Sequence, residues 1–260
     1  MAVIFINDRE FQTEEEVTLL ELARQKGIKI PALCYHQALS PYGACRLCTV
    51  EVCKEDKSRL VTSCTYPVRE EGISVYTDSP RVKQLRRVIV KLLLARCPQV
   101  KLIQDLAEEM GLEGSPFPLH DQEECILCGL CVRVCSEVIG KNAVSFSYRG
   151  AGRKVSTPFN EPSEECVGCT ACAFVCPSGA IKVEDSDETR YMEFWNTKIP
   201  LRRCKECGIT YTPENTPEYI LIKLELPKNL LDLCEKCRRK AVAESLSNYD
   251  VTSRSVIIKE

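Results

Sequence analysis

The chain has 260 residues, among them 18 cysteines but only 2 histidines and 1 tryptophan, and its formal net charge is −2. This charge argues against a nucleic-acid-binding protein, which usually carries a basic excess. No apolar run reaches the roughly 18 residues that a membrane span requires, and the first residues lack the pattern of a signal peptide. We therefore expect a cytoplasmic protein whose paired cysteines are metal ligands rather than disulfides.

Residues 1–78 are predicted to form a small domain rich in β-strands. The apolar stretch AVIFIND starts it, and the helix TLLELARQKG follows. Thr18 is expected to cap this helix with Glu21 as its reciprocal partner, and Gly27 to end it. The β-type runs CRLCTVEVC, RLVTSC and GISVYT complete the domain.

Four cysteines of this domain are spaced C-x10-C-x2-C-x15-C: Cys34, Cys45, Cys48 and Cys64. Four thiolates on the loops of a small β-rich domain are what a [2Fe–2S] cluster requires. The plant-type pattern has a first spacing of x4, so the match to that pattern is partial. The sequence predicts one [2Fe–2S] cluster here.

Residues 79–120 are predicted to be a helical connector. Ser79 caps its first helix and Pro80 lies in the first turn. One apolar face is expected from Leu85, Val88, Ile89, Leu92 and Leu93, with Arg86, Arg87 and Lys91 facing away. We favour a buried face that joins two domains over a docking face. A second helix is predicted to end at Gly111.

Residues 121–187 contain a doubled cysteine motif. CILCGLCVRVC at 125–135 and CVGCTACAFVC at 166–176 both read C-x2-C-x2-C-x3-C, and Pro177 follows the second. In two-cluster ferredoxins each run gives three ligands to one [4Fe–4S] cluster and its fourth ligand to the other. This rule assigns Cys125, Cys128, Cys131 and Cys176 to one [4Fe–4S] cluster, and Cys166, Cys169, Cys172 and Cys135 to a second. A pair of zinc sites would instead use separated CxxC knuckles.

The segment GAGRK between the two runs superficially resembles a dinucleotide loop. It lacks the third glycine and the surrounding βαβ unit, so a hairpin tip is predicted.

Residues 188–260 contain two further CxxC pairs, formed by Cys204, Cys207, Cys234 and Cys237. Two knuckles that meet across a hairpin make the closed four-thiolate site of a structural zinc ribbon. Zinc is the favoured metal, and a third [4Fe–4S] cluster is the alternative, since four thiolates fit either. The lone Cys53 and Cys97 are expected to be packing thiols.

The stretch PALCYHQALSPYGACRLCTVEV resembles the N-terminal [2Fe–2S] domain of the large iron–sulfur subunit of respiratory complex I. It is similar to the matching region of [FeFe] hydrogenases, and to the diaphorase-side subunit of NAD-reducing hydrogenases and formate dehydrogenases. The resemblance covers residues 1 to about 185. It implies an α+β chain with a β-grasp [2Fe–2S] domain, a helical connector and a two-[4Fe–4S] ferredoxin domain, followed here by the four-cysteine ribbon. These relatives often bind a further cluster between the two domains; the connector here has only Cys97 and no histidine before 120, so that cluster is expected to be absent.

The resemblance implies a non-catalytic electron-transfer subunit of an NAD(P)-linked hydrogenase or formate dehydrogenase. Its expected partners are a flavin- and NAD(P)-binding subunit and the catalytic subunits, with ferredoxin as a further candidate in an electron-bifurcating assembly. No catalytic residue is assigned in this chain. The alternatives are a zinc-stabilised scaffold or regulatory subunit, and the iron–sulfur subunit of another oxidoreductase such as a fumarate reductase.

Overall fold

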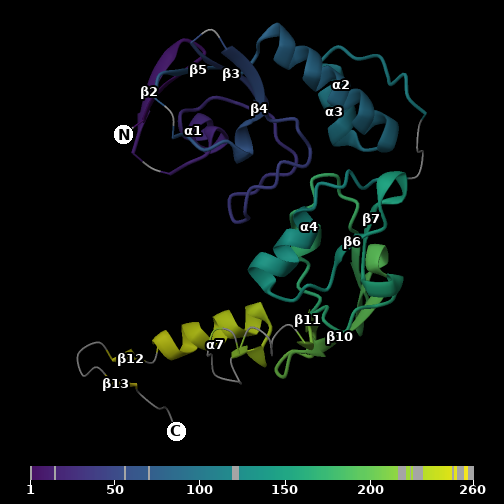
Figure 1. The fold of residues 1–260 in the computed structure, drawn as a ribbon. Coiled ribbons are helices and arrows are strands. Elements are labelled where there is room, and N and C mark those ends of the chain that lie inside the picture. The colour runs from purple at the N-terminus through teal and green to yellow at the C-terminus, as the bar shows by residue number, and fades with distance from the viewer. Residues whose placement is uncertain are drawn as a thin grey trace. The chain divides into compact units, whose positions relative to one another are not determined.

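The computed structural model describes residues 2–14, 16–55, 57–69, 71–118, 123–215, 221–222, 224, 231–247, 249–250 and 255–256. The chain divides into two compact units, which are treated separately below. The first comprises residues 1–156 and 171–181, and the second comprises residues 157–170 and 182–260. Figure 1 shows the elements of both units along the chain. No helix in the described part of the chain is long and apolar enough to cross a membrane.

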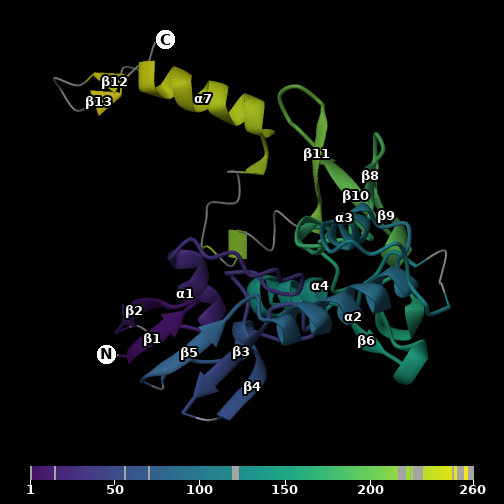
Figure 2. The same ribbon diagram turned by 90° about the horizontal axis from the view of Figure 1, so that it is seen from above.

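A five-stranded sheet in the order β2-β1-β5-β3-β4 begins the first unit. Its strands are β1 (Ala2–Ile6), β2 (Arg9–Thr13), β3 (Thr49–Lys54), β4 (Lys57–Thr62) and β5 (Ile73–Tyr76). β1 and β5 are parallel, and the other neighbouring pairs are antiparallel. Helix α1 (Leu19–Gln25) packs its apolar residues into the same core as the sheet, beside which it lies in Figures 1 and 2.

The predicted strands are present, and β2 is a further strand that was not predicted. β1 and β2 form a hairpin whose turn residues, Asn7 and Asp8, have φ of 48° and 62°. A two-residue turn with positive φ at both positions favours Asn, Asp and Gly and matches the twist of the flanking strands. The Asn-Asp pair was therefore the signal for the missing strand.

The predicted capping of α1 is confirmed. The Glu21 backbone N–H donates to the Thr18 hydroxyl at 3.3 Å, and the Thr18 backbone N–H donates to the Glu21 carboxylate at 2.8 Å. This reciprocal arrangement satisfies two of the backbone donors that a helix start leaves unpaired. Gly27 follows the helix with φ of 73°, which glycine adopts without strain.

Two helices follow the sheet, α2 (Pro80–Arg96) and α3 (Lys101–Glu109). Ser79 caps α2 through the Val82 N–H, as predicted. The predicted division of α2 into faces was wrong in part. Ile89 and Leu93 pack against the core as predicted, but Arg86 is buried, while Val88 and Leu92 are 45% and 50% exposed. The buried stripe runs through Val82, Arg86, Val90 and Cys97 instead, because the guanidinium of Arg86 finds acceptors inside the protein.

The rest of the first unit consists of short elements around the cysteine runs. Helix α4 (Leu130–Arg133) continues into the π-helical turn η2 (Val134–Ile139), and α5 (Ala171–Phe174) lies in the second run. β6 (Ser145–Ser147) and β7 (Lys154–Ser156) form an antiparallel hairpin, with the turn η3 (Gly150–Gly152) between them. The predicted hairpin tip at GAGRK is thereby confirmed.

The second unit contains a four-stranded antiparallel sheet in the order β11-β10-β9-β8. Its strands are β8 (Val183–Asp185), β9 (Thr189–Met192), β10 (Thr197–Arg203) and β11 (Thr210–Pro213). Helix α7 (Glu235–Ser247) and the pair β12 (Tyr249–Asp250) and β13 (Ser255–Val256) follow. The boundary predicted between residues 120 and 121 lies at positions outside the described residues.

The buried stripe of α2 gives a direct test. Val90→Ala is expected to lower the free energy of unfolding by about 2 kcal/mol, because it removes two methyl groups from a closed core. Val88→Ala, on the exposed face, is the matched control and should change it by less than about 0.5 kcal/mol. Urea unfolding under anaerobic conditions measures both; equal effects would contradict the observed orientation of the helix.

Candidate metal and cluster sites

The N-terminal four cysteines converge in the structure. Three of them are buried, Cys34, Cys48 and Cys64, at 1%, 0% and 1% exposure, and Cys45 is half-buried. Cys34 lies in the loop after α1, Cys48 directly before β3, and Cys64 in the turn η1 (Ser63–Thr65) after β4. The sheet therefore brings loops that are distant in sequence to one place.

The four thiols are close enough to shift one another's acidity. Hydrogen bonds from the thiols of Cys45 and Cys64 lower the pKa of Cys34 to about 2, helped by the Cys45 backbone N–H at 3.4 Å. A hydrogen bond from Cys64 lowers the pKa of Cys48 to about 6. The pKa values of Cys45 and Cys64 are raised by hydrogen bonding to Cys34. Cys34 and Cys48 thus favour the thiolate, the form that binds metal, whereas Cys45 and Cys64 favour the protonated thiol. The convergence of four cysteines fits a four-thiolate cluster.

A second group consists of Cys125, Cys128, Cys131 and Cys176, all in the first unit. Burial, with smaller contributions from the charges of Cys176, Cys125 and Cys34, raises the pKa of the Cys128 thiol to about 11. Burial likewise raises the pKa of Cys131, with contributions from Cys128, Cys125, Cys172 and Cys176. Cys34 and Cys128 also belong to one buried core cluster, against which Cys172 packs. The thiols of this group therefore lie within electrostatic reach of one another and of Cys34.

The remaining cysteines of the doubled motif belong to different units. Cys135 and Cys172 are in the first unit, whereas Cys166 and Cys169 are in the second. Cys135 accepts a hydrogen bond from the Ala143 N–H at 3.3 Å.

The loop that contains Cys166 and Cys169 packs on the sheet of the second unit. A Cβ on Gly168, where φ is 68°, would lie 2.9 Å from side-chain atoms of Ile199 and Pro213. Only glycine fits so close an approach without displacement.

Four arginines for which no such role was predicted hold the cysteine loops through backbone carbonyl groups. Arg86 donates to Leu47 and Thr49 on either side of Cys48, at 3.1 and 2.9 Å. The other three donate at 2.7 Å: Arg96 to Cys125, Arg133 to Cys34, and Arg190 to Gly168. Charged donors make stronger hydrogen bonds than neutral ones. The periodicity of apolar residues does not predict these hydrogen bonds, because it places arginine on the surface of the protein.

The first [4Fe–4S] run contacts the Cys34–Cys48 loop through a close packing of aromatic rings. Tyr42 stacks on Phe146, with ring centroids 6.4 Å apart. A Cβ on Gly129, where φ is 72°, would lie 3.0 Å from Phe146 and 3.3 Å from Tyr42. Glycine at this position is therefore needed both for the backbone conformation and for the space it leaves.

The C-terminal four cysteines form the most compact ligand group. The sulfur atoms of Cys204, Cys207, Cys234 and Cys237 all lie within 4.8 Å of one another. Cys207 and Cys234 sulfurs are 3.6 Å apart, and the Cys234 N–H donates to the Cys204 sulfur at 3.3 Å. Backbone N–H groups, first that of Cys207, lower the pKa of Cys204 to about 6. The group fits a metal ion.

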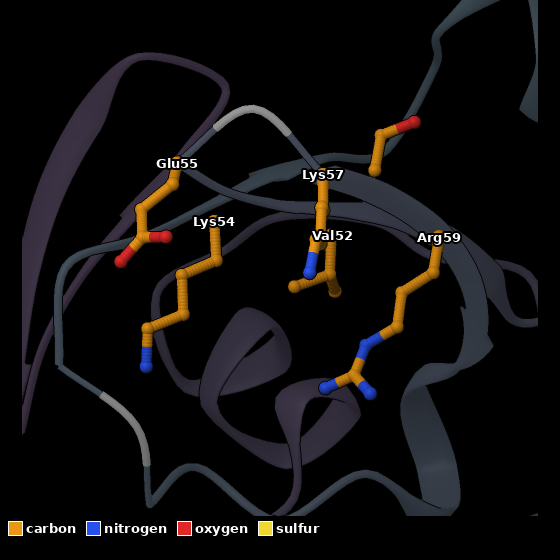
Figure 3. A pocket seen from close by; sticks show the side chains of 6 residues that line it. Val52, Lys54, Glu55, Lys57 and Arg59 are labelled. Carbon is orange, nitrogen blue, oxygen red and sulfur yellow. The ribbon is translucent and has the colours of Figure 1, made fainter.

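Two further cysteines are not among the predicted ligands, although one of them, Cys97, shares a buried core cluster with Cys34 and Cys128. Cys97 is fully buried in the core between α2 and α3, where burial raises its pKa to about 12, and Cys53 is half-buried on β3. A hollow at the β3–β4 hairpin is lined by Val52, Lys54, Glu55, Lys57, Ser58 and Arg59, of which Lys54 and Arg59 extend along the same side of the sheet in Figure 3. No cysteine lines it, so it is separate from the ligand groups.

Comparison with known families identifies two domains. Residues 2–80 match the 2Fe-2S iron-sulfur cluster binding domain, and residues 124–180 match the 4Fe-4S dicluster domain. The chain is 31% identical over 205 residues to the NADPH-Fe(3+) oxidoreductase subunit alpha of Geobacter sulfurreducens, covering 70% of this chain and 24% of that protein. It is 32% identical over 212 residues to the NADP-reducing hydrogenase subunit HndD of Solidesulfovibrio fructosivorans, covering 70% and 36%.

A third relative is the NADH-ubiquinone oxidoreductase 75 kDa subunit of Reclinomonas americana, at 30% identity over 181 residues, covering 60% of this chain and 26% of that protein. Among solved structures, a chain of the NAD+-reducing [NiFe]-hydrogenase in the H2-reduced state matches with a TM-score of 0.53 and 28% identity, covering 60% of this chain and 74% of that one.

The chain is therefore an iron–sulfur protein with a [2Fe–2S]-type and a [4Fe–4S] dicluster domain. It is homologous to subunits of NAD(P)-linked oxidoreductases, including complex I and hydrogenases, as the sequence resemblance implied. It spans about a quarter to a third of the length of these curated relatives.

Gly129 provides a test of the aromatic contact. Gly129→Ala is expected to destabilise the protein by more than the roughly 1–2 kcal/mol that a left-handed backbone costs an L-residue, because its Cβ would lie 3.0 Å from Phe146 and displace the stacked ring. Gly72→Ala is the matched control, since φ there is 70° and nothing lies within 4 Å of an added Cβ. Urea unfolding compares the two variants. Equal losses would mean that the aromatic packing is adaptable.

Proposed function

We propose that this chain is an electron-relay subunit of a cytoplasmic NAD(P)-linked oxidoreductase, a hydrogenase or formate dehydrogenase. The observation that carries the proposal is the convergence of Cys34, Cys45, Cys48 and Cys64 beside the group around Cys128 within one compact unit. When bound, an iron–sulfur cluster accepts and releases single electrons. The chain's own contribution is to hold the thiolates, space the sites and exclude water.

In this proposal the cluster ligands follow the spacing of the two motifs. The [2Fe–2S] cluster takes the N-terminal four cysteines, and one [4Fe–4S] cluster takes Cys125, Cys128, Cys131 and Cys176. A second [4Fe–4S] cluster takes Cys166, Cys169, Cys172 and Cys135. The proposed domains are the [2Fe–2S] domain at residues 1–78, the helical connector at 79–120, the two-[4Fe–4S] domain at 121–187 and the four-cysteine segment at 188–260. Partner chains supply the flavin, the NAD(P) site and the catalytic centre, in a bifurcating or a simple complex.

Zinc is the proposed metal at the C-terminal four cysteines. Four thiolates that share one tetrahedral zinc at about 2.3 Å lie about 3.8 Å from one another. In a [4Fe–4S] cluster the four thiolates bind four different irons at separate corners of the cube, so their sulfurs must lie farther apart than around one zinc ion. The 3.6 Å separation of the Cys207 and Cys234 sulfurs, within a group spanning 4.8 Å, supports the single ion. The site then stabilises the fold of the second unit rather than carrying electrons.

Metal analysis of a cysteine variant tests this assignment. Cys237→Ser is expected to lose about one zinc per chain while all iron is retained, since a structural zinc site needs all four ligands. Cys53→Ser, which removes a thiol outside the ligand groups, should lose neither metal. Loss of about four irons from Cys237→Ser would instead identify a third [4Fe–4S] cluster.

The relay itself is tested by reduction with NAD(P)H. The purified chain should stay oxidised with NADH or NADPH alone, since no flavin or nucleotide site is proposed in it. It should be reduced, as seen by bleaching of visible absorbance, when the native flavoprotein subunit that co-purifies with it is added. A chain that holds its clusters but is never reduced by such a subunit would contradict the relay. A colourless chain with zinc at every site would support the scaffold alternative.

A further inference from the structure

Arg133 connects the two ligand regions of the first unit. It lies in α4 between Cys131 and Cys135, and its side chain reaches the loop of the N-terminal four cysteines. There its Nη2 donates to the Cys34 carbonyl at 2.7 Å and its Nη1 to the Ser40 carbonyl. Glu137 accepts from the Ser40 N–H at 2.7 Å. A single helical turn therefore fixes the loop that contains Cys34.

Arg133 differs from the other three arginines that hold cysteine loops. Arg86 is paired with Asp78 at 3.2 Å, Arg96 with Glu123 at 3.5 Å, and Arg190 with Asp185 at 2.7 Å. Arg133 is only 9% exposed, yet within the described part of the chain no carboxylate lies at ion-pair distance from it. Its guanidinium carbon lies 5.2 Å from the centre of the Tyr42 ring. Its compensation is carbonyl dipoles, one aromatic face and the Glu137 carboxylate, which accepts from the N–H of the same Ser40 without lying at ion-pair distance from the guanidinium.

A buried cation that makes no direct ion pair is unfavourable, because it has lost its hydration. In addition, the Nε–H of Arg133 is buried and has no hydrogen-bond acceptor among the described residues. Both deficits point to a ligand that is negatively charged and accepts hydrogen bonds. Thiolate-bound iron–sulfur clusters have both properties, and their potentials respond to nearby charge and to hydrogen bonds to sulfur.

We propose that Arg133 is a positioning residue that holds the Cys34 loop against the first [4Fe–4S] ligand run and supplies the positive counter-charge for the [2Fe–2S] site. This inference rests on the proposed function, since it requires that cluster to be bound. A fixed positive charge stabilises the reduced, more negative form of a cluster. Arg133 therefore raises the reduction potential of the [2Fe–2S] site.

The test is an EPR-monitored redox titration of the full chain, purified anaerobically. Arg133→Gln is expected to lower the equilibrium constant for reduction of the [2Fe–2S] site about tenfold, which corresponds to about 59 mV for one electron. Arg133→Lys keeps the charge and should stay within about threefold of wild type. Arg96→Gln is the matched control. It also removes a hydrogen bond to a cysteine carbonyl, but the charge that it removes is already paired with Glu123. It should change the equilibrium constant for reduction of the [2Fe–2S] site less than twofold.

An Arg133→Gln variant that retains full iron and sulfide and titrates like wild type would overturn the inference. Equal shifts in the Gln and Lys variants would overturn the role of the charge. If Arg133→Gln fails to assemble its clusters, Arg133→Lys decides: assembly with a near-wild-type potential supports the counter-charge, and failure of both overturns it. Wild-type protein without a [2Fe–2S] signal would instead contradict the proposed function.

Discussion

The constraint on which the rest of the structure depends is that closely spaced thiols must be held inside the protein as thiolates. Burial opposes this, as the raised pKa of Cys128 shows, and neighbouring negative sulfurs oppose it further. At Cys34 and Cys204, hydrogen bonds from neighbouring thiols and backbone N–H groups partly offset the free-energy cost of ionising the thiol. A bound metal or cluster offsets the remainder, because it supplies positive charge where the sulfurs converge. Cluster binding and folding are therefore linked.

The fold meets this constraint by fixing loops rather than by placing ligands within strands. The apolar core that includes Leu47, Val90 and Ile103 joins the loop from Cys34 to Cys48, the connector helices and the first [4Fe–4S] run in one unit. Arginine side chains then fix the carbonyl groups of the cysteine loops. Rigid surroundings suit electron transfer, in which the protein supplies binding, orientation and electrostatics for a cofactor. Arg133 combines these roles where two ligand regions meet.

The sequence predicted what depends on local spacing. The capping box of Thr18, the hairpin at GAGRK and the C-terminal four-cysteine group are all present in the structure. It failed where tertiary contacts decide, as in α2, where apolar periodicity placed Arg86 outside and Val88 inside. A pattern of hydrophobicity contains no information about a buried carbonyl that accepts from arginine. The role of Arg133 was likewise not predictable, because its acceptor at Cys34 is 99 positions away.

The most direct measurement is the number of irons, acid-labile sulfides and zinc ions per chain, in protein purified without exposure to oxygen. One [2Fe–2S] and two [4Fe–4S] clusters predict about 10 irons, about 10 sulfides and about one zinc. The same preparation should show EPR signals of reduced clusters after dithionite treatment. Zinc with almost no iron or sulfide would contradict an electron relay and would establish the cysteine groups as structural sites.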